Sequence, residues 1–390
     1  MKKQHSIFLI PGILMLGVVL RMPFTTLPTV LTDIAQGLGV EVSSLGLLTS
    51  LPLLMFAIFS SFATGFAGKI GLERLFLVVL GLMVIGSGIR VFNLPLLYLG
   101  TLLLGAAIAI LNVLLPSLIQ ANQPQRIGSL TTLYVTAMGI ATAVGSSIAV
   151  PITQALSWQG LVWVLTAICG LALLIWLPNV RYNHFLNNHP KSQSTGSSLW
   201  KNRQVWALII FGGLQSLLFY TCMTWLPTMA SQAGLSGEEA GLLASIFSLI
   251  SIPFSMVIPS LTTRLAAPHR RFMLGIVSLA GLLGIAMLLF TGKNFAYWLT
   301  INLLIGTAVS ALFPYMMVTF SMKTSSPEKT AQLSGLAQTG GYVLAAFGPT
   351  LFGYSLQVFH SWTPAILSLL GLTLIMTIAL FIVDSAENIL

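Results

Sequence analysis

Charge is what this 390-residue sequence has least of: Asp, Glu, Lys and Arg together make up 6% of it. Soluble domains carry about 25% charged residues. Hydrophobic residues make up 56%, so the few charges cannot coat a water-facing surface. This composition excludes ordinary soluble enzymes and disordered proteins, and it predicts an all-α polytopic membrane protein.

Cysteine is also scarce. Cys169 and Cys222 both lie in apolar runs, which excludes a disulfide framework and a CxxC metal site. The motifs GxxxxGK[ST], GxSxG and HExxH and paired carboxylates are absent, so neither ATP-driven transport nor enzyme chemistry is supported. We expect no catalytic residue, metal or cofactor. The apolar run after Lys2 and Lys3 extends to about Leu31, too long for a cleavable signal peptide.

A membrane span needs about 20 apolar residues, and twelve segments of the sequence meet this requirement. The predicted spans cover residues 7–31, 45–67, 75–91, 96–119, 128–152, 159–177, 205–229, 240–262, 272–290, 296–319, 331–356 and 363–383.

The basic residues predict an orientation, because cytoplasmic loops are enriched in Lys and Arg. With both termini in the cytoplasm, fourteen of the seventeen basic residues fall inside, Lys293 falls outside, Arg90 lies near an outer helix end and Arg21 lies within a span. Scattered basic residues of this kind indicate membrane orientation rather than nucleic-acid binding. We also expect a monomeric multi-pass protein of a bacterial cytoplasmic membrane, with no nucleic-acid partner.

The two halves of the sequence repeat. Residues 27–29 (Leu-Pro-Thr) recur as 226–228, residues 46–50 (Gly-Leu-Leu-Thr-Ser) recur in part as 241–245, Pro116 matches Pro314, and residues 157–158 (Ser-Trp) recur as 361–362. The polar segment 178–203 separates them and reads as a cytoplasmic linker. The sequence thus predicts six-helix halves at 1–177 and 204–390, arranged as a parallel repeat typical of transporters.

Several segments resemble a known family. Twelve spans in a 6+6 repeat are similar to the major facilitator superfamily, and residues 65–74 resemble its signature cytoplasmic loop. The matching loop residues are Gly65, Gly68, Lys69, Gly71 and Arg74, with Gly68 in place of the usual acid. Within that superfamily, residues 20–21, 46–52, 112–116, 225–227 and 337–342 resemble the cyanate permease and 2-nitroimidazole transporter family. The resemblance implies a secondary transporter working by alternating access on a cyanate-like anion or a nitroimidazole-like heterocycle.

Arg21 is the candidate main substrate contact. It lies about 21 Å along the first span at 1.5 Å per residue, and a charge at such depth costs about 2.5–3.5 kcal/mol on insertion scales. None of the eight acidic residues falls within a predicted span. A guanidinium facing an aqueous cavity would bind an anion through its planar fork. Two alternatives remain: the side chain extends to the outer headgroups, or it caps carbonyls freed by Pro23 and Pro28.

Other polar residues inside spans are candidates for lining the cavity. They are Asn112, Tyr134, Gln215, Tyr220, Gln338 and Tyr342. Hydrogen bonding between helices is the alternative role for each of them. An offset of 199 pairs Arg21 with Tyr220, which predicts a planar anion held between a charge and a ring. Arg90 is a candidate gate, with an interfacial anchor as its alternative.

No Asp, Glu or His lies inside a predicted span, so any proton coupling would not use a buried carboxylate relay. The same absence argues against an exporter of cationic drugs. A drug or metabolite exporter of the same fold stays open as the alternative function. A membrane receptor would show the same hydropathy, but it would normally add a soluble signalling domain.

Overall fold

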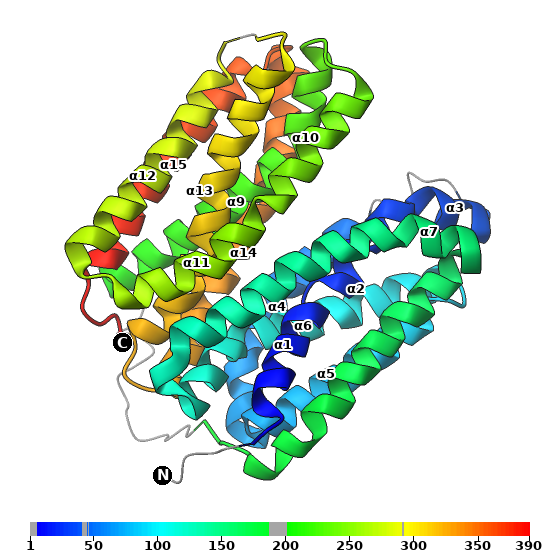
Figure 1. The fold of residues 1–390 in the computed structure, drawn as a ribbon, viewed down its shortest axis with the longest axis vertical. Helices are drawn as coiled ribbons and strands as arrows, with labels where there is room; N and C mark the ends of the chain where they lie inside the picture. Colours follow the sequence, from blue (N-terminus) through cyan, green and yellow to red (C-terminus); the bar gives the residue numbers. More distant parts are fainter. Residues whose placement is uncertain (1–5, 41–44, 46, 187–200, 291) are drawn as a thin grey trace. The chain divides into compact units, whose positions relative to one another are not determined.

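The computed structural model describes residues 6–40, 45, 47–186, 201–290 and 292–390 (Figure 1). The regular structure of these residues is entirely helical, which confirms the all-α fold class. Nine helical stretches among the described residues are long and apolar enough to cross a membrane. Lys2, Lys3, Lys191 and residues 187–200 of the predicted linker lie outside the described residues.

The chain forms two compact units. Unit 1 comprises Met1–Pro190 and Ser325–Thr339, and unit 2 comprises Lys191–Thr324 and Gly340–Leu390. The helices of unit 1 are α1 (Leu9–Val19), α2 (Met22–Thr25), η1 (Leu27–Val30), α3 (Leu31–Leu38), α4 (Leu47–Ile70), α5 (Leu72–Ile89), α6 (Leu94–Asn122), η3 (Pro124–Arg126), α7 (Ile127–Trp176) and η4 (Leu177–Tyr182). The predicted division at 177 and 204 stays a prediction.

Unit 2 contains the helices of the second repeat. They are α9 (Arg203–Gln232), α10 (Gly237–Leu249), α11 (Ser251–Arg264), α12 (Ala267–Met287), α13 (Phe295–Met322) and α15 (Thr363–Ser385). Helix α14 (Pro327–Phe359) is divided: its first part, up to Thr339, belongs to unit 1 and the rest to unit 2.

The packing within the two units follows the repeat. In unit 1, α6 packs on α4 and α5, and α7 packs on α1 and α5. In unit 2, α13 packs on α11 and α12, and α15 packs on α9 and α12. The fourth predicted span therefore packs on the second and third spans in unit 1, as the tenth packs on the eighth and ninth in unit 2.

The connection between α4 and α5 differs from the predicted loop. Gly65, Gly68 and Lys69 lie in α4, and Arg74 lies in α5, so Gly71 is the single residue between the two helices. Gly71 has φ +89°, and a Cβ there would collide with the side chain of Asn183. That side chain donates to the carbonyl of Ile70 and accepts from the amide of Arg74. Glycine is required because the helix reverses in one residue against another segment.

The fifth and sixth predicted spans are also joined by a single residue. The fifth and sixth spans form the single element α7, which turns at Ser157 with φ 68° and ψ 170° (Figure 1). The first predicted span is instead interrupted: α1 ends at Val19, and the chain continues through α2, η1 and α3. The apolar run was long enough for one helix, but Pro23 and Pro28 stand at the starts of α2 and η1, where a missing amide hydrogen is tolerated.

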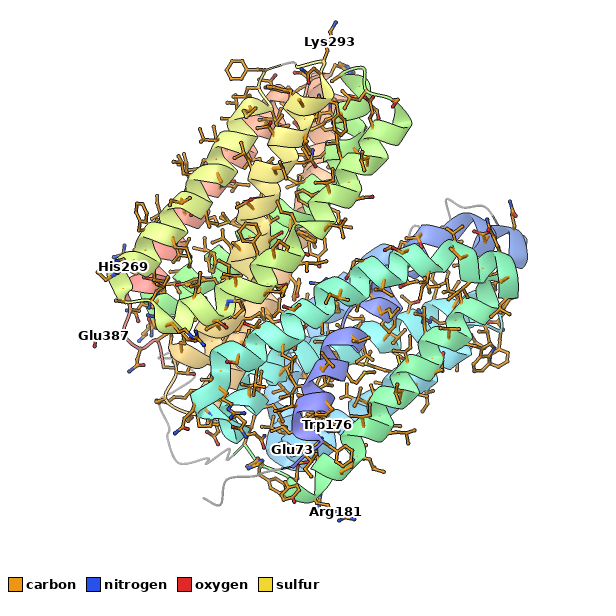
Figure 2. All side chains as sticks on the ribbon, viewed as in Figure 1. Glu73, Trp176, Arg181, His269, Lys293 and Glu387 are labelled. Atoms are coloured by element: carbon orange, nitrogen blue, oxygen red, sulfur yellow. The ribbon has the colours of Figure 1, made fainter. Side chains whose placement is uncertain are left out.

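The ends of each unit carry the charges expected from the sequence. Figure 2 shows Glu73, Trp176 and Arg181 at one end of unit 1. In unit 2, His269 and Glu387 lie at one end and Lys293 at the opposite end. In unit 2, residues predicted for the inner side and Lys293, predicted for the outer side, thus lie at opposite ends, and which end faces the cytoplasm stays a prediction.

Candidate functional site

Arg21 lies at the interruption of the first helix. It is the residue before α2, with φ −122° and ψ −52°, outside helical geometry, and its side chain is half-buried. Its carbonyl starts the new helix by accepting from the amides of Phe24 and Thr25 at 3.0 and 2.9 Å and from the Thr25 hydroxyl at 3.0 Å. The break exists because Pro23 stands at the start of α2, where a missing amide hydrogen is tolerated.

Asn112 and Gln338 are brought together in unit 1. Gln338 Nε2 donates to the backbone carbonyl of Asn112 at 3.3 Å and to Ser334 Oγ at 2.8 Å. The contact with a carbonyl fixes which end of the amide carries the nitrogen. Within the described residues, Gln338 Oε1 receives no hydrogen bond, although Gln338 is 4% exposed. The pair thus presents a buried acceptor that a donor on a ligand could satisfy.

Tyr134 lies in α7 of the same unit and is buried, and its hydroxyl has no hydrogen-bond partner among the described residues. Its backbone lies against Gly17 of α1, where an added Cβ would be 3.0 Å from Tyr134 Cα. The small residue lets α1 approach α7 one turn before Arg21. Helix α7 therefore braces the segment that leads into the break.

Arg90, the candidate gate, lies buried beside the break in the first helix. Its side chain is 1% exposed at the end of α5. Nη1 donates to the Pro23 carbonyl at 3.1 Å, Nη2 to Ser87 Oγ at 2.9 Å, and Nε to the Ser87 carbonyl at 3.4 Å. None of these acceptors is a carboxylate. Arg90 thus caps the Pro23 carbonyl, and carbonyl capping near Pro23 and Pro28 was the second alternative role considered for Arg21.

A small cleft lies beside the break, with about 310 Å³ of space including the part open to solvent. Pro23, Leu27 and Pro28 line one side, and Arg90 contributes a charge to the lining. Unit 2 has a cleft of about 320 Å³ at the equivalent place, lined by Cys222, Leu226 and Pro227.

The three candidates of unit 2 differ in environment. Gln215 is 2% exposed and donates through Nε2 to the Val309 carbonyl at 2.9 Å, a bond between α9 and α13. Tyr220 is half-buried and meets the ring of Phe219 edge-on at 5.2 Å. Tyr342 is 8% exposed on α14, one turn after Gln338.

A buried carboxylate that the sequence did not single out lies at the charged end of unit 1. Glu73, fully buried, accepts from the backbone amide of His184 at 2.6 Å and from Asn122 at 3.0 Å, and its carboxylate lies 2.7 Å from His184 Nδ1. The hydrogen bond to Glu73 raises the pKa of His184 above its ordinary value, against the opposing effect of burial. This cluster ties the residues after α7 to the start of α5.

Unit 2 has its own buried carboxylate, Asp384 at the end of α15. It lies 2.5 Å from Arg270 Nε and 3.3 Å from Arg271 Nε, and it accepts from the Tyr315 hydroxyl at 2.9 Å. Lys323 Nζ donates to the carbonyls of Asp384 and Ala386. Burial, followed by the charge of Arg270, lowers the pKa of Lys323.

The end of the chain is held at the same place. The amide of Ile389 donates to the Lys323 carbonyl at 2.8 Å, and Asn202 Nδ2 donates to the Ile389 carbonyl at 3.0 Å. A helix-period pattern could not reveal either cluster, because the partners are 49 to 187 residues apart in sequence.

Comparisons with known proteins agree with this architecture. Residues 13–349 match the family model described as Major Facilitator Superfamily. The chain is 33% identical over 380 residues to the 2-nitroimidazole transporter of Escherichia coli (strain K12), covering 96% of this chain and 95% of that protein. It is also 33% identical over 380 residues to the uncharacterized transporter YycB of Bacillus subtilis (strain 168), covering 96% and 93%.

The fold is also similar to that of solved structures. The proton:xylose symporter XylE bound to 6-bromo-6-deoxy-D-glucose matches with a TM-score of 0.76 at 12% identity, covering 96% of this chain and 94% of that one. At this identity, the match shows the shared fold alone.

Proposed function

The chain belongs to the major facilitator superfamily, and we propose that it is a secondary active transporter of a small anionic or planar polar solute, with Arg21 as the main substrate contact. It is a membrane transporter rather than an enzyme, as its named relatives are. In this proposal it works in a bacterial cytoplasmic membrane, with both termini inside, and carries its solute by alternating access.

The observation that carries the proposal is the position of Arg21. A cationic side chain stands, half-buried, where the first helix of a transporter is interrupted. Interrupted helices direct backbone groups towards substrates in transporters of other folds. The guanidinium presents a planar fork of donors, which suits the two oxygens of a nitro or carboxylate group.

The buried amide of Gln338 supports a solute that also donates a hydrogen bond. Gln338 Oε1 receives none from the described residues, whereas both hydrogens of Nε2 have acceptors. A nitroimidazole offers nitro oxygens for Arg21 and a ring N–H for Gln338, and cyanate has no donor. The relative named a 2-nitroimidazole transporter, similar along nearly the whole chain, favours the same solute class.

Substitution of Arg21 tests the proposal. Arg21→Gln should weaken binding of 2-nitroimidazole at least tenfold, since hydrogen bonds to charged groups contribute about 1.5–3 kcal/mol. Arg21→Lys should also bind more weakly than the wild type, because a point charge loses the fork. Ligand-induced thermal stabilisation of the purified protein measures both effects.

Arg126→Gln is the matched control, because it removes the same charge from an exposed position. Unchanged affinity in Arg21→Gln, with a melting temperature like that of Arg126→Gln, would reject Arg21 as the substrate contact. Flux into proteoliposomes under imposed proton and substrate gradients then separates coupled transport from uniport, and import from export.

A further inference from the structure

We infer that Arg90 is a positioning residue that holds the interruption of the first helix and thereby sets the place of Arg21. The inference rests on the proposed role of Arg21 for its effect on transport. Its structural part, that Arg90 holds the break, can be tested independently of any substrate.

The Pro23 carbonyl is the group that needs a donor. It belongs to the four-residue helix α2, and the last four carbonyls of a helix find no donor within that helix. Arg90 Nη1, at the end of α5, donates to this carbonyl at 3.1 Å. Pro23 is two residues after Arg21, so the bond fixes the backbone next to Arg21. A charged donor makes this bond stronger than a neutral one would.

The guanidinium is itself fixed by a buried network. Ser87 accepts from Arg90 through both its hydroxyl and its carbonyl, and the Ser87 hydroxyl also accepts from Thr166 Oγ1 at 2.8 Å. The Thr166 hydroxyl lies 2.8 Å from the Val162 carbonyl as well. The network therefore connects α2 to α5 and α7, and it leaves the guanidinium little freedom to turn away from Pro23.

The helices beside Arg90 are shaped to admit it. A Cβ added to Gly100 of α6 would lie 2.6 Å from Arg90 Cγ and would collide with the Gly86 carbonyl. A Cβ added to Gly86 would lie 3.1 Å from the Gly100 carbonyl. Two glycines facing each other across α5 and α6 thus leave the slot in which the Arg90 stem lies.

The second repeat has apolar residues at the positions of this polar network. The offset of 198 that relates Pro116 to Pro314 places Ile285 at the position of Ser87 and Leu288 at that of Arg90. The offset of 204 from Ser157 to Ser361 places Leu370 at the position of Thr166. In that unit the first helix, α9, runs unbroken from Arg203 to Gln232. The polar network occurs where the helix is interrupted and is replaced by apolar residues where it is not.

Two variants of Arg90 test the inference. Arg90→Gln removes the charge and shortens the reach to Pro23. Arg90→Lys keeps the charge but replaces the planar fork, whose separate nitrogens reach Pro23 and Ser87, with a single ammonium group. Leu288→Met, at the equivalent position of unit 2, is the control for a change at a helix end.

The substrate-independent measurement uses Thr25→Cys, one turn after Arg21, and a charged thiol reagent. Cys169 and Cys222 are buried, which keeps their own labelling slow. We expect Arg90→Gln to change the labelling rate at residue 25 at least threefold, Arg90→Lys to change it less, and Leu288→Met to leave it as in the wild type. An unchanged rate in both Arg90 variants would overturn the inference.

Transport kinetics with 2-nitroimidazole complete the test. We expect Arg90→Gln to raise KM at least fivefold, with a partial return in Arg90→Lys. If Arg21→Gln leaves binding unchanged but Arg90→Gln alters labelling, the proposed function fails and the inference about the break stands. A lowered melting temperature with unchanged labelling and KM would show that Arg90 is structural only. If Arg90→Gln does not fold, Arg90→Lys and Ser87→Ala carry the same comparison.

Discussion

The first helices of the two repeats contain matching prolines and have different shapes. Pro28 corresponds to Pro227 at the offset of 199, and α9 continues through Pro227 without a break. The position of Pro23 is occupied by Cys222 in α9. One proline near the outer end is therefore compatible with a continuous helix, and the break in unit 1 coincides with the second proline and with Arg90.

The clefts beside the two first helices are also similar in size and differ in charge. They have similar volumes, about 310 and 320 Å³, and are lined at equivalent positions by residues 23, 27 and 28 or 222, 226 and 227. Arg90 adds a charge in unit 1, and Leu288 occupies its position in unit 2. The repeat thus preserves the shape of the bundle, while the substitutions confine the charged, irregular segment to one unit.

A proline placed in α9 at the position equivalent to Pro23 should give the largest loss of stability and tests the difference between the two first helices directly. Cys222→Pro would remove the amide that serves the i−4 carbonyl and would clash with it, and nothing at Leu288 could cap a freed carbonyl. We expect a loss of about 3 kcal/mol or more, seen as a lower midpoint in thermal or denaturant unfolding. Cys222→Ala is the control for loss of the thiol, and equal stability of the two variants would mean that unit 2 accommodates a break without an arginine.

The glycine slot around Arg90 should give a smaller effect. Gly100→Ala pushes a methyl group against Arg90 Cγ and the Gly86 carbonyl, and we expect overpacking to cost about 1–3 kcal/mol. Gly81→Ala, in the neighbouring α5, meets no heavy atom within 4 Å and should gain about 0.5–1 kcal/mol from helix propensity. The equivalent of Gly100 in unit 2 is Trp298, so that unit fills this position instead. Unfolding midpoints that move in the same direction in both variants would argue against the slot.

The carboxylate clusters should differ in their dependence on pH, with the smallest effect. The pKa of His184 is raised above its ordinary value of 6.5 by its bond to Glu73. Its contribution to stability is therefore complete below about pH 6.5 and is lost as the pH rises through the folded-state pKa. We expect less than about 1 kcal/mol, because the His184 side chain is partly exposed.

The measurement is the melting temperature of the wild type and of His184→Gln from about pH 6 to pH 8. The wild type should lose its advantage over His184→Gln across this range. Asp384 in unit 2 is paired with two arginines instead of a histidine. A difference between the two proteins that does not vary with pH would assign no ionic part to the His184–Glu73 contact.

Much of the fold follows from sequence periodicity and length. Each of the twelve predicted segments lies mainly in helix among the described residues, since about 20 apolar residues in a row have no other stable arrangement in lipid. The short connections were harder to predict. Residues 65–70 read as a loop because Gly65, Gly68 and Lys69 resemble a signature sequence, but a glycine at 71 with positive φ lets α4 extend to Ile70.

The residues of the candidate site stay predictions from the sequence, and their contacts with one another could not be predicted from it. The proline pair indicated that freed carbonyls would need a cationic cap, and Arg21 was the nearby candidate. The residue that caps the Pro23 carbonyl is Arg90, 67 positions away. One sequence cannot show that contact, because it depends on how α5 packs against the segment around α2. Ser87, one helical turn before Arg90, is the local signal that could have indicated a fixed guanidinium.

The contacts of Ile389 with Lys323 and Asn202 have a practical consequence for anyone handling this protein. The amides of Ile389 and Leu390 both donate to the Lys323 carbonyl, so removing these two residues would take away both donors of a buried carbonyl. An affinity handle should therefore be separated from Leu390 by a spacer, or placed at the amino terminus, so that the contacts of Ile389 with Lys323 and Asn202 are kept.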